Sequence, residues 1–146
     1  MQNRFSLKLL VAAILSIPLL VAGDSSQLVL GSLFSYRLNR IEVPTQLSAL
    51  TPFDWNEVCA SHPYDGDFRH PVTGRIYPAP LEHAHDGTWV LLFLDAKGEP
   101  RHLTGKSPFI EDFSGCILRR HAIISPSAAG RQSKTFSVQS SASPRE

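Results

Sequence analysis

The segment from Phe53 to Tyr64, F-D-W-N-E-V-C-A-S-H-P-Y, constrains the fold more than any other part of the chain. It holds one of the two tryptophans and one of the two cysteines among 146 residues. Trp and Tyr side chains bury a large apolar body and keep one polar atom that needs a partner, so they fix the geometry of a core. A cysteine between them can tie the segment to a distant part of the chain. We therefore expect the fold to be built around this segment.

The N-terminus has the parts of a secretory signal peptide. Arg4 and Lys8 supply a positive region, residues 9–22 are an apolar run, and a small V-A-G sequence precedes Asp24. The run is shorter than the roughly 20 residues that span a membrane and fits the apolar region of a signal peptide. We expect residues 1–23 to be cleaved on export; a retained N-terminal membrane anchor is the alternative. Either way the remainder is exported, to the periplasm or the extracellular space.

Export changes the interpretation of the only two cysteines, Cys59 and Cys116. In an oxidising compartment two cysteines most simply form one disulfide. They lie 57 positions apart (116 − 59), and closing a loop of that size stabilises a chain by about 4 kcal/mol in the chain-entropy account. A redox pair or a nucleophilic thiol is the alternative, but such thiols usually lie in a C-x-x-C pair or beside an activating base. The pattern favours a structural bridge.

The charge balance argues against nucleic acid as a partner. Lys plus Arg is 14, Asp plus Glu is 13, and the formal net charge is +1. A balance so close to zero provides no global field that would attract nucleic acid or an anionic membrane. We expect contact with a membrane only through the N-terminal segment, if that segment is retained.

Two strands are predicted clearly. Residues 88–94 (TWVLLFL) are continuously apolar, which is typical of a central strand covered on both faces, and a glycine-containing turn returns the chain through 101–104. Residues 116–124 form a second strand that ends before Pro126, and 134–138 alternates as its partner.

The other expected elements are short. Residues 27–36 are compatible with a helix, with a strand at 27–30 as the alternative, and 108–113 with a helical turn or a loop. The remaining expectations are a brief extended segment at 40–43, helical turns at 45–50 and 52–55, a strand at 57–61, an irregular loop at 65–86 and a disordered tail at 139–146. The predicted fold is therefore a single α+β domain, residues 24–138, with a small antiparallel sheet (two C-terminal hairpins plus an earlier strand), short helices and one disulfide.

The motif W-N-E-V-C, with P-Y a few residues later, resembles a loose group of small exported or membrane-anchored bacterial proteins. Their usual form is W-D-x-V-C or W-D-x-V-Y followed by P-Y and a downstream apolar hairpin. The resemblance covers about half the chain, residues 53–124, and differs at Asn56, where the group commonly has Asp. It implies an exported domain and supplies no activity, ligand or catalytic residue.

Metal binding is the chemistry that the histidines suggest. His83 and His85 form an H-x-H pair flanked by Glu82 and Asp86, and on a strand both rings would lie on one face. Structural zinc needs four ligands and catalytic zinc three, and no spacing here determines a third. A solvated loop with two histidines is the simpler interpretation, and we expect no cofactor.

No catalytic residues are predicted. Carboxylates such as Asp54 and Glu57, or Glu111 and Asp112, are most simply solvated surface groups, and Ser114 near His121 lacks the G-x-S-x-G nucleophile elbow. A small hydrolase that uses carboxylates is therefore the least favoured class.

These observations favour a non-catalytic binding or envelope-associated accessory module whose partner is an unknown protein or envelope component. Its expected contact surface is the 65–86 loop with Tyr64, Tyr77, His83 and His85. The alternative is a metal-binding protein or metal-dependent enzyme centred on His83 and His85.

Overall fold

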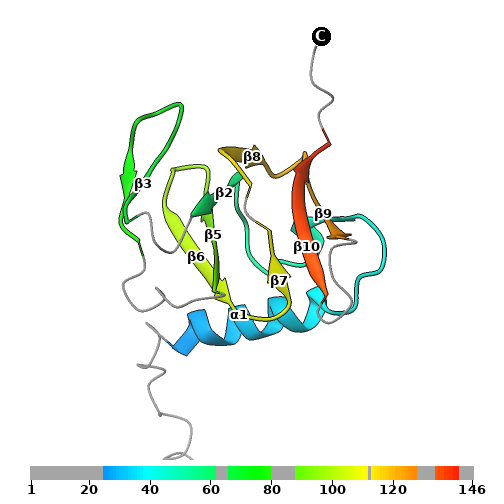
Figure 1. Ribbon diagram of the computed structural model, residues 1–146. Coiled ribbons are helices and arrows are strands. Elements are labelled where there is room, and N and C mark those ends of the chain that lie inside the picture. The colour runs from blue at the N-terminus through cyan, green and yellow to red at the C-terminus, as the bar shows by residue number, and fades with distance from the viewer. Residues whose placement is uncertain (1–24, 62–65, 80–87, 112, 128–133, 142–146) are drawn as a thin grey trace, which may run out of the picture.

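The computed structural model describes residues 25–61, 66–79, 88–111, 113–127 and 134–141. Within these residues the protein consists mostly of sheet, with one α-helix and one turn of 3-10 helix (Figure 1). The elements in chain order are α1 (Ser25–Leu38), β1 (Thr45–Gln46), η1 (Leu47–Ala49), β2 (Glu57–Ser61), β3 (Phe68–Arg69), β4 (Ile76–Tyr77), β5 (Trp89–Leu94), β6 (Pro100–Gly105), β7 (Phe109–Ile110), β8 (Cys116–Leu118), β9 (Ala122–Ser127) and β10 (Thr135–Ser140).

The strands form two four-stranded sheets and one small hairpin. The disulfide sheet has the order β6-β5-β2-β8 and is antiparallel throughout. The C-terminal sheet has the order β1-β9-β10-β7, in which only β7 and β10 are parallel. β3 pairs with β4 alone. The antiparallel β5–β6 hairpin and the earlier strand β2 confirm the corresponding predictions. The expectation of one small sheet is wrong, because the second hairpin, β9–β10, lies in a separate sheet.

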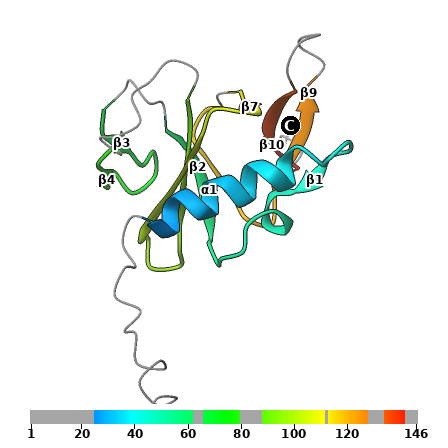
Figure 2. The ribbon, with the colours of Figure 1, turned by 90° about the horizontal axis from the view of Figure 1, so that it is seen from below.

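The main core lies between the two sheets and α1. Helix α1 runs along the ends of both sheets and contributes Phe34 and Leu38, both fully buried (Figures 1 and 2). The inner face of the disulfide sheet contributes Trp89, Leu91 and Phe93, because alternate side chains of a strand point to the same side. The Trp89 indole N–H donates to the carbonyl oxygen of Pro108 at 2.8 Å, so its one polar atom is satisfied inside the core.

Glycines allow the closest approaches around this core. A Cβ on Gly105 would lie 2.3 Å from the Trp89 ring, and one on Gly31 would lie 2.8 Å from the carbonyl oxygen of Thr104. The second contact brings α1 directly onto β6. The helix therefore packs on the sheet at a point where a side chain would separate them.

The outer face of the disulfide sheet carries a second, smaller core. Leu92 and Leu94 of β5 lie there with Cys59 of β2, all nearly or fully buried, and Tyr77 and Phe68 of the β3–β4 hairpin pack over them. β5 is thus covered on both faces, as its apolar sequence predicts.

The predicted strand over 116–124 is wrong in one respect. The segment divides into β8, which joins the disulfide sheet, and β9, which joins the C-terminal sheet. A turn at 119–121, in which the His121 N–H donates to the Leu118 carbonyl, carries the chain from one sheet to the other. β9 also continues through Pro126 to Ser127.

Several short elements also differ from expectation. Residues 52–55 and 40–43 form neither a helical turn nor a strand, and 139–140, expected in a disordered tail, belong to β10. Of the alternatives left open, 27–36 is helical and 108–113 contains β7. Of the helical turn expected at 45–50, only 47–49 is helical, as the 3-10 turn η1, and 45–46 form strand β1. Part of the irregular 65–86 loop forms β3 and β4. Among the described residues, the sole α-helix is too short and too polar to cross a membrane.

Candidate functional site: the disulfide and its hairpin cover

The predicted disulfide is present and joins neighbouring strands. Cys59 and Cys116 are directly opposite each other in the register of β2 and β8, with their Cα atoms 4.1 Å apart. Cys59 is fully buried in the outer core, where it packs with Leu92 of β5 and with Tyr77 of the hairpin. Cys116 is half-buried on β8, the edge strand of the sheet. The two sulfurs of one bond therefore have different surroundings.

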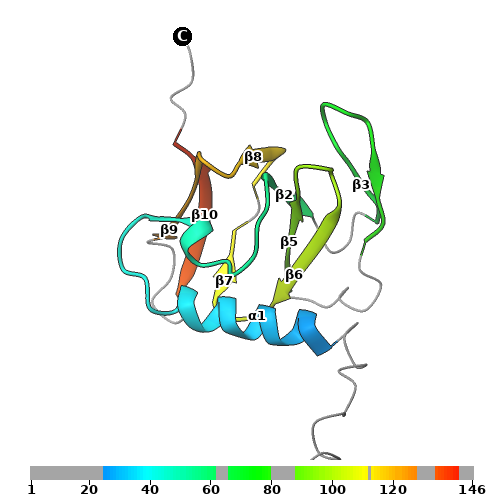
Figure 3. The same ribbon diagram turned by 180° about the vertical axis from the view of Figure 1, so that it is seen from behind.

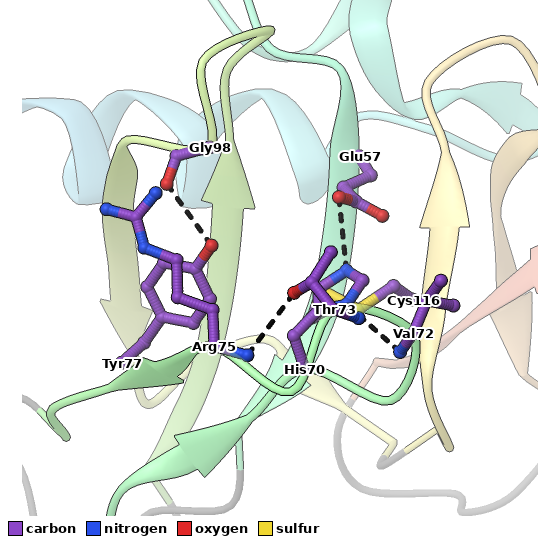
Figure 4. The surroundings of a disulfide bond; sticks show 9 residues. Glu57, His70, Val72, Thr73, Arg75, Tyr77, Gly98 and Cys116 are labelled. Carbon is purple, nitrogen blue, oxygen red and sulfur yellow. Dashed lines mark hydrogen bonds and ion pairs between the residues drawn. A yellow bond between two sulfur atoms is a disulfide. The ribbon is translucent and has the colours of Figure 1, made fainter.

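A polar pair lies beside the disulfide on the same outer face. Glu57 precedes Cys59 by two residues on β2, so both side chains point to that face. His70, which follows β3, is 4 % exposed, and its Nε2 lies 3.2 Å from Glu57 Oε1 (Figure 4). One donor atom each from Glu57, Cys59, His70 and Cys116 all lie within 4.8 Å of one another.

The backbone of the hairpin determines the tautomer of His70. The N–H groups of Val72 and Thr73 donate to Nδ1 of His70, at 3.2 and 3.1 Å. Nδ1 is therefore an unprotonated acceptor, and in the neutral ring the proton lies on Nε2, which donates to Glu57. The ring acts as a bracket that ties the hairpin turn to β2.

This tautomer argues against a metal centre at the cluster. A metal would need the lone pair of Nε2, which carries the proton, and both sulfurs are bonded to each other rather than available as thiolates. Only the Glu57 carboxylate is then left as an anionic ligand, fewer than the three protein ligands of a catalytic zinc site. The four side chains are better described as a disulfide with a polar clasp.

Two further contacts fix the far side of the hairpin. The Tyr77 hydroxyl donates to the carbonyl oxygen of Gly98 in the β5–β6 turn at 3.2 Å (Figure 4). Arg75 pairs with Glu99 at 3.4 Å. The Arg75 guanidinium also lies over the Tyr77 ring, 5.1 Å from its centroid. Polar groups thus attach the hairpin to the sheet at its turn, through His70, and at β4, through Tyr77.

The tip of the hairpin is exposed. Val72 is 87 % exposed and Ile76 is 50 % exposed, so these are the most exposed of the large apolar side chains in the hairpin. Residues 68–77 (FRHPVTGRIY) contain Arg69 and Arg75 and no carboxylate. Figures 1 and 3 show the hairpin projecting beside the disulfide sheet, at the end of the molecule away from β9 and β10. It presents two exposed apolar side chains, with Arg69 nearby and Arg75 paired with Glu99.

The predicted contact surface is corrected in one position. Tyr77 is only 4 % exposed, because its ring packs into the outer core, so it holds the hairpin rather than facing a partner. Tyr64, His83 and His85 lie outside the described residues. The metal-binding hypothesis for His83 and His85 therefore stays a prediction.

The other polar candidates have separate partners. Arg119 donates to Asp54 at 2.8 Å, and the Ser127 hydroxyl donates to Glu111 at 2.9 Å. Arg120 donates to Nε2 of its neighbour His121 at 3.0 Å, which occupies the lone pair that a base would use. These contacts place each group in a surface interaction of its own.

One carboxylate has an altered pKa. The Asp95 carboxylate accepts the backbone N–H of Glu99 at 2.9 Å and that of Lys97 at 2.8 Å. These hydrogen bonds, that from Glu99 first, lower the pKa of Asp95 below its ordinary value. The group closes the β5–β6 turn that receives Tyr77, so its role is in the turn.

The residues that sequence reasoning missed are His70 and Glu57 as a pair. They are 13 positions apart and come together only because the hairpin folds back over β2. The available signal was the i, i+2 relation of Glu57 and Cys59 on a strand, which puts a carboxylate beside the disulfide.

Comparison with known proteins identifies no relative of this chain. Neither the models of known protein families, nor the curated protein sequences, nor the solved structures include a significant match.

Proposed function

We propose that the protein is an exported, disulfide-bonded accessory module that binds an envelope protein through the tip of the β3–β4 hairpin. The observation that carries this proposal is the contrast within the hairpin. One side of it is held against the sheet by His70 and Tyr77, while Val72 and Ile76 are left exposed. Side chains presented on an element that is already ordered lose little further conformational entropy on binding, which favours affinity.

The chemistry of the tip indicates the kind of partner. Exposed Val72 and Ile76 with Arg69 nearby suit an apolar patch that has a carboxylate at its border on another protein, because the charges would be complementary. The disulfide is consistent with an oxidising, exported environment. Cleavage after residue 23 and periplasmic or extracellular location complete the proposal.

A photo-crosslinking residue at position 72 tests this function in cells that export the protein from its own signal. The matched control is position 43, because Val43 is also an exposed valine, 65 % exposed, in the segment between α1 and β1 at the other end of the molecule. We expect position 72, and not position 43, to crosslink to one envelope protein.

Binding of the purified partner then decides the proposal. Val72→Asp with Ile76→Asp should weaken binding by about 100-fold or more, since truncating or charging a central apolar contact costs about 2–4 kcal/mol. Equal crosslinking at 43 and 72, or unchanged affinity in the double variant, would contradict the proposal. Binding to vesicles rich in anionic lipid that depends on Val72 would replace the protein partner by a membrane surface.

A further inference from the structure

The disulfide can be attacked from one side only. A thiolate bonds to the sulfur that it attacks and displaces the other sulfur. The accessible sulfur is therefore the one that carries the mixed disulfide. Attack on Cys59 would have to come through β5, and Cys59 is 0 % exposed. Cys116 lies on β8, the edge strand, so no further strand of the sheet blocks an approach in line with the S–S bond on its side.

The hairpin covers the face on which that attack would occur. Phe68 and Tyr77 pack on the outer core that includes Cys116, and His70 lies beside both sulfurs. Only two residues from each strand pair within the hairpin, Phe68 with Tyr77 and Arg69 with Ile76. A unit with so few backbone contacts opens at a lower free energy than the sheet below it, because sub-global opening follows local contact density.

The Glu57 carboxylate adds an electrostatic barrier. Its oxygen lies within 4.8 Å of both sulfurs, and its side chain is only 24 % exposed. A negative charge that close repels an incoming thiolate, and a partly buried charge is screened less by salt than an exposed one. The cover and the charge therefore both slow reduction in the closed protein.

We propose that the Cys59–Cys116 bond is a thiol–disulfide exchange site that the β3–β4 hairpin opens and closes, with a dithiol reductant as its substrate. When the hairpin lifts, one thiolate of the dithiol attacks Sγ of Cys116. The S–S bond breaks, and Sγ of Cys59 leaves as a thiolate. The second thiolate of the reductant then attacks its own mixed-disulfide sulfur and releases Cys116 as a thiolate. The dithiol, oxidised to a disulfide, has supplied two electrons, and the protein thiolates take two protons from water.

Trapping the first intermediate tests which sulfur is attacked. The oxidised protein is treated with reduced glutathione and quenched with N-ethylmaleimide, and both cysteines are mapped by peptide mass spectrometry. Because Cys116 is at the edge of the sheet and Cys59 is fully buried, we expect glutathione on Cys116 and maleimide on Cys59. Glutathione on Cys59, or on both cysteines equally, would overturn the assignment. This test does not depend on any partner of the hairpin.

Reduction rates test the cover. With dithiothreitol in excess, His70→Ala should be reduced about tenfold faster than the wild type or more, because one buried hydrogen bond that holds the hairpin is lost. Tyr77→Phe removes only the hydroxyl bond to Gly98 and should give a smaller increase. Val43→Ser, at an exposed position between α1 and β1, is the control and should leave the rate unchanged. The proposal would be overturned if the disulfide of both His70→Ala and Tyr77→Phe were reduced at the wild-type rate.

Two further measurements separate this opening from unfolding and from simple packing. Opening of the hairpin alone predicts a reduction rate that is nearly independent of low urea concentrations, whereas reduction through global unfolding would rise steeply with urea. Glu57→Gln keeps an acceptor for His70 and removes the charge, so it should be reduced faster at low salt, with the difference shrinking at high salt. A steep urea dependence in the wild type would contradict the hairpin as the gate.

Discussion

The two faces of β5 are equally buried but differently built. On the inner face, Trp89, Leu91 and Phe93 pack against α1 and the C-terminal sheet in one large apolar core. On the outer face, Leu92 and Leu94 lie under a short hairpin that is held by a histidine clasp, a tyrosine hydroxyl and an exposed ion pair. Burial alone therefore does not distinguish the faces, but the covering element does.

This difference assigns the two faces different roles. Apolar packing between large elements is lost only when the whole domain unfolds, whereas a few polar contacts at the base of a hairpin can break locally. The inner face stabilises the fold. The outer face combines an openable cover with the molecule's only disulfide.

Neighbouring residues of β5 provide the largest expected contrast. Phe93→Ala should reduce the free energy of unfolding by about 3–5 kcal/mol, because it removes a fully buried ring. That ring contacts Phe53 and Trp55 edge-to-face, with centroids 5.3 and 5.1 Å away. Leu92→Ala on the outer face should reduce the free energy of unfolding by about 2 kcal/mol, near the low end for such a change. The loss is small because the hairpin can move to fill the cavity. Urea unfolding measures both, and an equal or greater loss for Leu92→Ala would contradict the contrast.

Removing the disulfide is the next effect in size. Cys59→Ala with Cys116→Ala should lower the free energy of unfolding by about 2–4 kcal/mol, through the entropy of the unfolded chain. The sheet itself should persist, because β2 keeps its full pairing with β5. Wild-type protein under reducing conditions is the matched control and should show a similar loss. Far-UV circular dichroism characteristic of an unfolded chain in the double variant would show that the bond is required for folding.

Two glycines sharpen the comparison. Gly105→Ala should cost about 1–3 kcal/mol, because its Cβ would overlap the Trp89 ring of the inner core. Gly74, with φ of +68° in the hairpin turn, has nothing within 4 Å of an added Cβ, so Gly74→Ala strains only the backbone. Gly74→Ala should reduce stability by about 1 kcal/mol, and only the stability of the hairpin should be affected. Thermal unfolding gives the two costs, and the reverse ranking would argue against a locally independent hairpin.

The smallest expected effect is on the pH dependence of stability, through Asp95. The folded-state pKa of Asp95 is lowered, so its contribution to stability is present above the unfolded pKa of about 3.9 and is lost as the pH falls through the folded value. Asp95→Asn should therefore lower the melting temperature slightly at neutral pH and not at the acidic end. Melting curves measured from acidic to neutral pH test this prediction. A decrease in melting temperature that is independent of pH would rule out the charged carboxylate as its cause.

The sequence predicted the parts of the fold that local patterns determine. The unbroken apolar run of β5 and the glycine turn after it indicated a central strand and its hairpin, and two cysteines in an exported chain indicated one disulfide. It failed at 116–124, where periodicity looks continuous but the chain changes sheets at a turn. The His70–Glu57 clasp was also out of reach, because the strand pattern places Glu57 beside the disulfide but does not identify its partner, and the contact depends on where the hairpin lies.

Native-state hydrogen exchange tests the central claim, that the hairpin opens separately from the sheet it covers. The amides of His70 and Gly74 donate to the Arg75 and His70 carbonyls within the hairpin, and those of Leu92 and Cys59 lie in the sheet beneath. We predict that the hairpin amides exchange at a low free energy with little dependence on urea, while the sheet amides exchange only near the free energy of global unfolding. His70→Ala should accelerate only the first group. Exchange of both groups at one free energy with the same urea slope would contradict the account.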